Sequence, residues 1–212
     1  METQLVETLV IGAAAYLLGS ISFAVLVSKL MGLPDPRSYG SKNPGATNVL
    51  RSGSRVAAGL TLVGDAGKGA LAVGLAALYT GEAPALSVAA PVAGAMAFLG
   101  HLYPVYHGFK GGKGVATAAG ALLALDPLRL GLGTLGTFLI LVAFFRMISF
   151  AAIVSAAFAI FAAWFIYPLT PLAAAVTAMA ALLIGRHREN ILRIARGTEP
   201  RLWGKKAGEK KT

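Results

Sequence analysis

The sequence predicts an all-α polytopic membrane protein with seven transmembrane helices, its N-terminus outside and its C-terminus in the cytoplasm. Hydrophobic residues make up 56% of the 212 positions and charged residues only 13%, unlike the composition of soluble domains. Apolar runs of about one bilayer crossing, roughly 20 residues, recur along nearly the whole chain. The basic residues lie between and after these runs. We therefore expect residues 1–212 to form a single integral membrane domain.

The apolar runs define the expected membrane helices. They lie near residues 5–28, 60–81, 85–103, 114–127, 130–146, 147–167 and 170–186. The first run is too long for a signal-peptide core and has Glu2 and Glu7 at its start in place of basic residues, so we expect it to be retained. The fourth is the weakest, because Val115 to Leu125 is shorter than the roughly 17 residues of a normal crossing. A re-entrant segment is the alternative there.

The basic residues orient the chain. With the N-terminus outside, the cytoplasmic parts are segments 29–59 and 104–113, the turn at Arg146 and the tail from Arg186. Of the 19 lysines and arginines, only Arg129 then lies outside, as the positive-inside rule prefers. A re-entrant fourth segment would move the basic tail to the opposite side, which favours seven crossings. Topology thus explains the net charge of +10, and we expect no nucleic-acid partner.

The residue types present restrict the chemistry. The chain has no cysteine, which excludes thiolate catalysis and cysteine-based metal sites. Its histidines and carboxylates form no cluster with the spacing of metal ligands. We expect neither a metal nor another cofactor.

The segment GFKGGKGVAT, Gly108 to Thr117, has the composition of a phosphate-binding turn. It is not a Walker A loop, because Lys113 stands where that motif needs its second glycine. Glycines can still direct backbone N–H groups at phosphate, the following helix offers its positive end, and lysine adds charge. The candidate residues are Gly111, Gly112, Lys113 and Gly114. The alternative is a glycine-rich membrane turn with snorkelling lysines.

The longest polar segment contains SYGSKNPGATNVLRSGSR, Ser38 to Arg55. Its short hydrogen-bonding side chains suit an oxyanion or a polyol, and Arg51 offers a bidentate fork for phosphate. These side chains are Ser41, Asn43, Thr47 and Asn48. The same residues also favour turns whatever the function, so the two interpretations stay open for each of them.

Two further segments carry ionisable residues. In GDAGKG, Asp65 and Lys68 are three apart and share a helix face, which allows either a site at membrane depth or, as we favour, a structural pair. In RHRENI, His187 and Asn190 share a face that could meet the two polar loops. A basic stop-transfer collar is the alternative for RHRENI, and it explains the arginines better than the histidine and the asparagine.

Four motifs together closely resemble the bacterial acyl-phosphate:glycerol-3-phosphate acyltransferase family. They are GSKNPGATNVLR, GDAGKG, GHLYPVYHGFKGGKGVAT, and RHRENI with the later GTE, and they follow in order over almost the whole chain. The resemblance implies an enzyme of the bacterial cytoplasmic membrane, with its active site facing the cytoplasm. It implies acyl transfer from acyl phosphate to the 1-hydroxyl of sn-glycerol 3-phosphate, giving lysophosphatidate and phosphate in the first step of phospholipid synthesis. No obligate protein partner is inferred.

The resemblance also assigns roles. It makes Ser41, Arg51, His187 and Asn190 catalytic and the glycine motif phosphate-binding, and it adds Glu199 from the last motif, which we expect to be structural like Asp65. We group Asn43, Thr47, Asn48 and Lys68 as further substrate-binding residues. One departure is Lys42, where a glycine is expected, since lysine would strain a turn that needs positive φ.

Alternatives remain for the proton transfer and for the function. His187 could act as the general base, or an oxygen of the acyl phosphate could take the proton while Ser41 and Asn190 orient the reactants, which we favour. Ser41 as nucleophile is a third route. A transporter or channel for an anionic solute is the competing function, although its binding residues should lie near the bilayer midplane. The HxxxxD motif of acyl-CoA-type acyltransferases is absent.

Overall fold

The computed structural model describes residues 2–202, which form ten α-helices and three short helical turns without a strand in that range. The α-helices are α1 (Glu2–Gly19), α2 (Phe23–Leu30), α3 (Ala46–Val49), α4 (Arg55–Thr80), α5 (Ala89–Leu102), α6 (Val115–Leu125), α7 (Gly133–Phe145), α8 (Ile148–Ile166), α9 (Pro171–Arg186) and α10 (Arg188–Ala195). The turns are η1 (Leu50–Ser52), η2 (Val105–His107) and the π-helical η3 (Pro127–Leu132).

Within residues 2–202, four helical stretches are long and apolar enough to cross a bilayer. They are Glu2–Leu30, Arg55–Thr80, Pro127–Phe145 and Ile148–Ile166. The helices α6 and α9 are apolar but shorter. The predicted all-helical membrane fold is confirmed, whereas the number of crossings stays a prediction.

The first span is not the single helix that the continuous apolar run predicted. Helix α1 ends at Gly19 and α2 begins at Phe23. The interruption exposes backbone groups that would be costly at membrane depth if left unpaired. The ammonium of Lys68, on α4, donates to the Ile21 carbonyl at 2.6 Å, and the Ser20 hydroxyl accepts the Val105 N–H at 3.3 Å. The break is therefore stabilised by residues distant in sequence, which hydropathy cannot register.

Small residues bring the central helices into close contact. A Cβ added at Gly120 of α6 would overlap the carbonyl oxygen of Ala66 in α4, so the backbones of these helices touch there. The buried core is rich in alanine from α4, α5, α8 and α9. Close backbone approach is how membrane helices gain van der Waals contact without a hydrophobic driving force.

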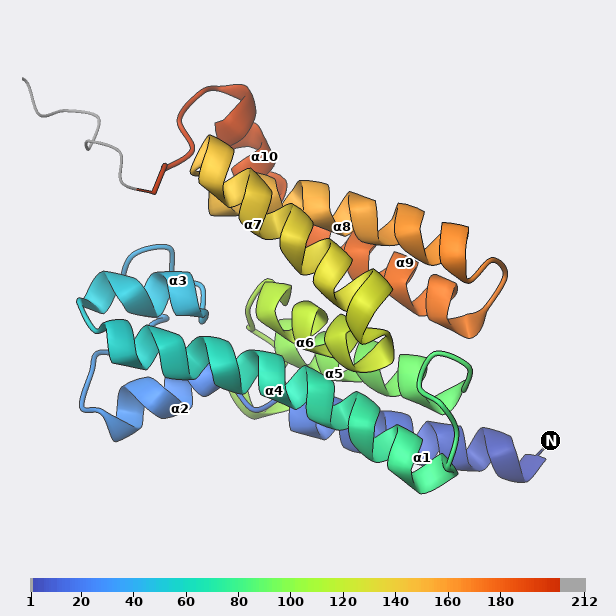
Figure 1. The fold of residues 1–212 in the computed structure, drawn as a ribbon. Coiled ribbons are helices and arrows are strands. Elements are labelled where there is room, and N and C mark those ends of the chain that lie inside the picture. Colours follow the sequence, from blue (N-terminus) through green and yellow to red (C-terminus); the bar gives the residue numbers. More distant parts are fainter. Residues whose placement is uncertain (1, 203–212) are drawn as a thin grey trace, which may run out of the picture.

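The polar connections gather at one end of the bundle. Figure 1 shows α2, α3 and α10 at this end, while the N-terminus of α1 and the α4–α5 and α8–α9 connections lie at the other. We call the first the α10 end. The motifs singled out in the sequence, apart from Asp65 and Lys68 inside α4, lie in its connections and in the helix ends next to them.

Candidate active site

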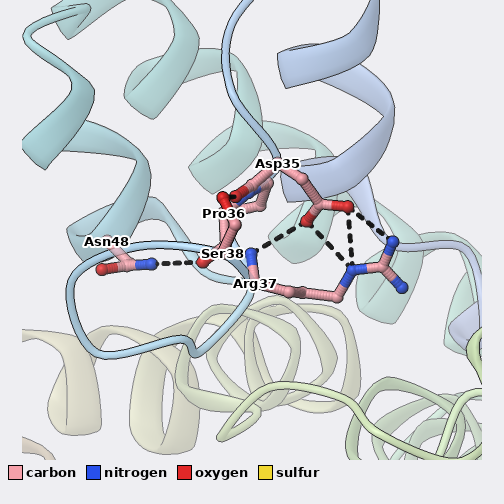
Figure 2. A network of polar contacts seen from close by, with 5 residues as sticks. All are labelled: Asp35, Pro36, Arg37, Ser38 and Asn48. Atoms are coloured by element: carbon pink, nitrogen blue, oxygen red, sulfur yellow. Dashed lines mark hydrogen bonds and ion pairs between the residues drawn. The ribbon is translucent and has the colours of Figure 1, made fainter.

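Asn48 organises the loop between α2 and α4. Its side chain is buried, and its Nδ2 donates to the carbonyls of Pro36 at 2.6 Å and Tyr39 at 3.2 Å. Its Oδ1 accepts the backbone N–H of Ser41 at 3.0 Å and an Arg51 N–H at 3.4 Å. Figure 2 shows the contact with Pro36. Asn48 thus brings Ser41 and Arg51 to one place, and its own amide is occupied inside the loop.

The same loop begins with an ion pair and contains a strained residue. Both oxygens of Asp35 accept from Arg37, the shortest contact being 2.6 Å (Figure 2), and this hydrogen bonding lowers the pKa of the Asp35 carboxyl. Lys42 has φ of 55°, the conformation for which a glycine was expected at this position. A non-glycine residue there costs about 1 kcal/mol.

The glycine turn after η2 folds back onto the end of α5. The amides of Gly111 and Gly112 donate to the carbonyls of Leu102 and His101 at 3.2 and 3.1 Å. These two amides are therefore occupied by the end of α5, and a phosphate-binding role for Gly111 and Gly112 stays a prediction. A Cβ on Gly112 would overlap Nε2 of His101 and lie 3.0 Å from the Pro44 carbonyl, so glycine is needed here for close approach.

The unpaired amides come after the two glycines. No acceptor within residues 2–202 pairs with the N–H groups of residues 113–117, which include the two residues before α6 and its first turn. The first N–H groups of a helix lack partners within the helix, and together with its dipole they favour an anion. The part of the turn with amides free to meet an anion thus begins at Lys113, and anion binding there stays a prediction.

Lys113 links the turn to the last motif. Its ammonium donates to Oδ1 of Asn190, whose Nδ2 donates to Glu199 Oε1 at 2.6 Å. Ser149, at the start of α8, donates to the same Glu199 oxygen at 2.6 Å, and Arg193 donates to the other at 2.7 Å. Because Glu199 takes the N–H side of the amide, the carbonyl side of Asn190 faces Lys113.

The charge states of Glu199 and Lys113 follow from their burial, their hydrogen bonds and the charges near them. Burial alone would raise the pKa of Glu199, but the bonds from Ser149, Asn190 and Arg193 outweigh it and lower the pKa. Burial lowers the pKa of Lys113, and the charge of Arg193 adds to this effect. Glu199 is therefore an anion, and Lys113 is a cation that gives up its proton at lower pH than a free lysine.

His187 lies between α9 and α10 and is only 2% exposed. Burial lowers its pKa to about 4, so the ring is neutral at neutral pH. Its Nδ1 lies 2.8 Å from the Leu183 carbonyl, which requires the proton on Nδ1. Nε2 then carries the lone pair.

Asp65 and Lys68 form a buried pair within α4. Their side chains are 3% and 1% exposed, and the ammonium lies 2.9 Å from the carboxylate. His101 Nδ1 lies 3.5 Å from the same carboxylate oxygen. Since Lys68 also donates to Ile21, its ammonium is engaged with two groups inside the protein, and its substrate-binding role stays a prediction.

The structure brings three of the four motifs together. The Pro44 carbonyl of the first meets Gly112 of the third, and Lys113 of the third meets Asn190 of the last. The buried pair of Asp65 and Lys68 contacts this group through Asp65, whose carboxylate lies next to His101 of the third motif. Thr47 is exposed and Asn43 half-buried, and their substrate-binding roles stay predictions. Within residues 2–202, no three His, Asp or Glu side chains are grouped to hold a metal ion.

Sequence reasoning did not single out three residues of this region. His101 lies within a quoted motif but was given no role, although its position before the glycine turn was a usable signal. Arg186 was explained by topology. Ser149 lies 50 residues from its partner Glu199, and no local pattern connects them.

Comparison with known proteins identifies the family. A family model described as glycerol-3-phosphate acyltransferase matches residues 9–197. The chain belongs to the glycerol-3-phosphate acyltransferase family. A glycerol-3-phosphate acyltransferase of Ralstonia nicotianae is 57% identical over 95% of this chain and 97% of the relative. One from Cupriavidus taiwanensis is 58% identical over 93% of this chain and 98% of the relative.

Solved structures of this acyltransferase family have the same fold. The crystal structure of PlsY (YgiH), an integral membrane glycerol 3-phosphate acyltransferase, in its glycerol 3-phosphate form is 36% identical with a TM-score of 0.85. That match covers 92% of this chain and 95% of PlsY. The lysophosphatidic acid form of PlsY is 35% identical with a TM-score of 0.83 over the same shares. The predicted acyltransferase family is confirmed, and the transporter or channel alternative is not supported.

Proposed function

We propose that this protein transfers a fatty acyl group from acyl phosphate to the 1-hydroxyl of sn-glycerol 3-phosphate, forming lysophosphatidic acid and phosphate. The observation that carries the proposal is that Lys113, just before α6, donates to Asn190, which in turn donates to Glu199. The preceding Gly112 lies against Pro44 of the loop that holds Ser41 and Arg51. This arrangement occurs in a member of the family whose solved relatives have forms with glycerol 3-phosphate and with lysophosphatidic acid.

The phosphate of the acceptor binds at the start of α6. The unpaired amides of residues 113–117 and the Lys113 ammonium supply donors and positive charge. Lysine has three N–H donors, so Lys113 can hold Asn190 and still reach an anion. Arg51 adds a fork for the second phosphate, that of the donor. Lys68, which is buried and paired, has a structural role in this proposal.

The reaction depends more on alignment of the two substrates than on chemical activation of either one. The 1-hydroxyl oxygen attacks the acyl carbonyl carbon, a new C–O bond forms, and the bond from that carbon to the phosphate oxygen breaks. Acyl phosphate is a mixed anhydride with a good leaving group, so holding the reactants in line and stabilising the oxyanion supply most of the catalysis.

The hydroxyl proton passes to the leaving phosphate. A base is most effective when its pKa lies near the working pH, and the pKa of His187, about 4, is too low for this. His187 instead keeps the start of α10 in place through its bond to Leu183, so that Asn190 is oriented. Ser41 and Asn190 position the reactants in this account.

The site faces the cytoplasm of a bacterial inner-membrane protein with seven crossings. The broken first span and α4 to α9 supply these crossings, with α6 shortened by the turn at Asp126. The basic connections lie at the α10 end, in agreement with the positive-inside rule. The acyl chain then lies in the bilayer while both phosphates stay at its surface, and the reaction needs no protein partner.

Turnover by the purified protein in lipid or detergent tests the proposed function. Long-chain acyl phosphate would be supplied with and without sn-glycerol 3-phosphate, and acyl-CoA would serve as the control donor. We expect phosphate release and lysophosphatidic acid only when acyl phosphate and the acceptor are both present. Absence of turnover by protein shown to be folded, or equal turnover with acyl-CoA, would contradict the proposal.

A further inference from the structure

Arg186, the last residue of α9, contacts the carbonyl side of the glycine turn. Its Nη2 lies 2.9 Å from the Gly111 oxygen and 3.2 Å from the Gly112 oxygen, and its Nε lies 3.3 Å from the latter. Its guanidinium carbon lies 5.7 Å from the centre of the Tyr103 ring. A basic collar at a membrane surface requires none of these contacts.

With these contacts, both backbone N–H groups and both backbone carbonyls of Gly111 and Gly112 have hydrogen-bond partners. The N–H groups of Gly111 and Gly112 donate to the end of α5, and their carbonyls accept from Arg186. The two residues are thus held on one side by α5 and on the other by α9. Their backbone has no further strong donor to offer a substrate, so their contribution to phosphate binding is indirect.

The pairing also sets the direction of the next amide. In a trans peptide the C=O and the following N–H point in opposite directions, and no peptide bond in the described chain is cis. Since the Gly112 carbonyl points at Arg186, the Lys113 N–H points away from it. That N–H is the first of the amides without an acceptor in residues 2–202 that lead into α6.

We propose that Arg186 is a positioning residue for phosphate binding. It fixes the Gly112–Lys113 peptide so that the Lys113 amide, the Lys113 side chain and the first turn of α6 are presented together to the acceptor's phosphate. The inference rests on the proposed function and extends it to a residue that touches neither substrate. Arginine is required because its planar fork reaches two carbonyls at once and lies over the Tyr103 ring, whereas a lysine ammonium is a single point of charge.

Arg186→Lys distinguishes this positioning role from a purely topological role of a basic residue at the membrane surface. The substitution keeps the positive charge and removes the guanidinium that reaches two carbonyls. Arg188→Lys is the matched control, since Arg188 is an exposed residue of the same basic segment. Steady-state kinetics with sn-glycerol 3-phosphate and acyl phosphate would be combined with hydrogen–deuterium exchange of segment 105–117. We expect Arg186→Lys to raise KM for glycerol 3-phosphate about 10-fold, with kcat within about two-fold, and to accelerate exchange in the segment. Arg188→Lys should change neither.

The two readouts distinguish failure of this inference from failure of the proposed function. Unchanged exchange and unchanged KM in Arg186→Lys would overturn the positioning role, as would a loss of kcat alone. Faster exchange in Arg186→Lys together with wild-type protein that shows no turnover would support the role of Arg186 in holding the turn and contradict the acyltransferase proposal. Melting temperatures of both variants would establish that each is folded.

Discussion

At the scale of the residue, Asn190 stands between a carboxylate and an ammonium. Glu199 accepts from its Nδ2, and its Oδ1 accepts from Lys113. The sequence motifs predicted Lys113, Asn190 and Glu199 as site or supporting residues, because each belongs to a short recognisable pattern. The contact of Ser149 with Glu199 could not be predicted, because it depends on how α8 packs against the tail. The role of Arg186 was not predicted, because the positive-inside rule alone explains an arginine at the end of the last membrane helix.

Replacement of Lys113 by alanine tests the charge at the phosphate site. A hydrogen bond to a charged group contributes about 1.5 to 3 kcal/mol, which corresponds to a KM for glycerol 3-phosphate raised roughly 10-fold to 100-fold. Lys110→Ala is the control, because Lys110 is exposed in the same turn. Kinetics that stay the same for both substrates in Lys113→Ala would refute the phosphate site.

Replacement of His187 by alanine tests the proton route. We expect reduced turnover, because the bond to Leu183 that holds the start of α10 is lost. The remaining activity should still rise with pH, since the phosphate oxygen that takes the proton becomes more fully ionised. The pH–rate profile of the variant measures this. Complete loss of activity in a folded variant would instead indicate that His187 is the base.

The low pKa of His187 also predicts how stability depends on pH. The folded protein keeps the ring neutral down to about pH 4, whereas the unfolded chain takes up a proton near pH 6.5. Stability contributed by the neutral ring is therefore present above about pH 6.5 and is lost as pH falls toward 4. The melting temperature of the wild type should fall more steeply over this range than that of His187→Gln. Parallel curves would show that burial of His187 has no such effect.

At the scale of the element, hydropathy located the helices well where apolar runs end at polar turns. The expected segments 147–167 and 170–186 correspond to α8 (Ile148–Ile166) and α9 (Pro171–Arg186). The break between α1 and α2 was missed, since the Ile21 carbonyl within it is paired by Lys68, which is distant in sequence, and its residues stay apolar or small. The start of α4 at Arg55, capped by Ser54, came earlier than the apolar run indicated.

Gly120→Ala tests the close contact of α4 with α6. Its Cβ would overlap the Ala66 carbonyl, so the helices must separate, and overpacking of this kind costs about 1 to 3 kcal/mol. Gly136→Ala in α7 is the control, because a Cβ there meets nothing within 4 Å. We expect thermal melting in detergent to show a clear loss for Gly120→Ala only. Equal melting temperatures would mean that the contact is not required.

At the scale of the whole molecule, the order of helices brings motifs far apart in sequence to the α10 end. The basic residues predicted this end as a common face, because loops of one sign lie on one side of a membrane. Which side chains meet there could not be derived from charge, since it depends on helix packing.

The chain without cysteine allows a direct test of its orientation. Single cysteines would replace Glu82, in the α4–α5 connection, and Lys110, in the glycine turn. A membrane-impermeant maleimide applied to intact cells should label Glu82→Cys and should label Lys110→Cys only after permeabilisation. The reverse pattern would contradict the cytoplasmic placement of the site.

The most direct test of the account is the position of the phosphate in a structure of this chain determined with sn-glycerol 3-phosphate. We predict the phosphate within hydrogen-bonding distance of the Lys113 ammonium and of amides at the start of α6, with Arg186 still bound to the carbonyls of Gly111 and Gly112. A phosphate held elsewhere, for example by Lys68 after its separation from Asp65, would contradict the assignment of the site.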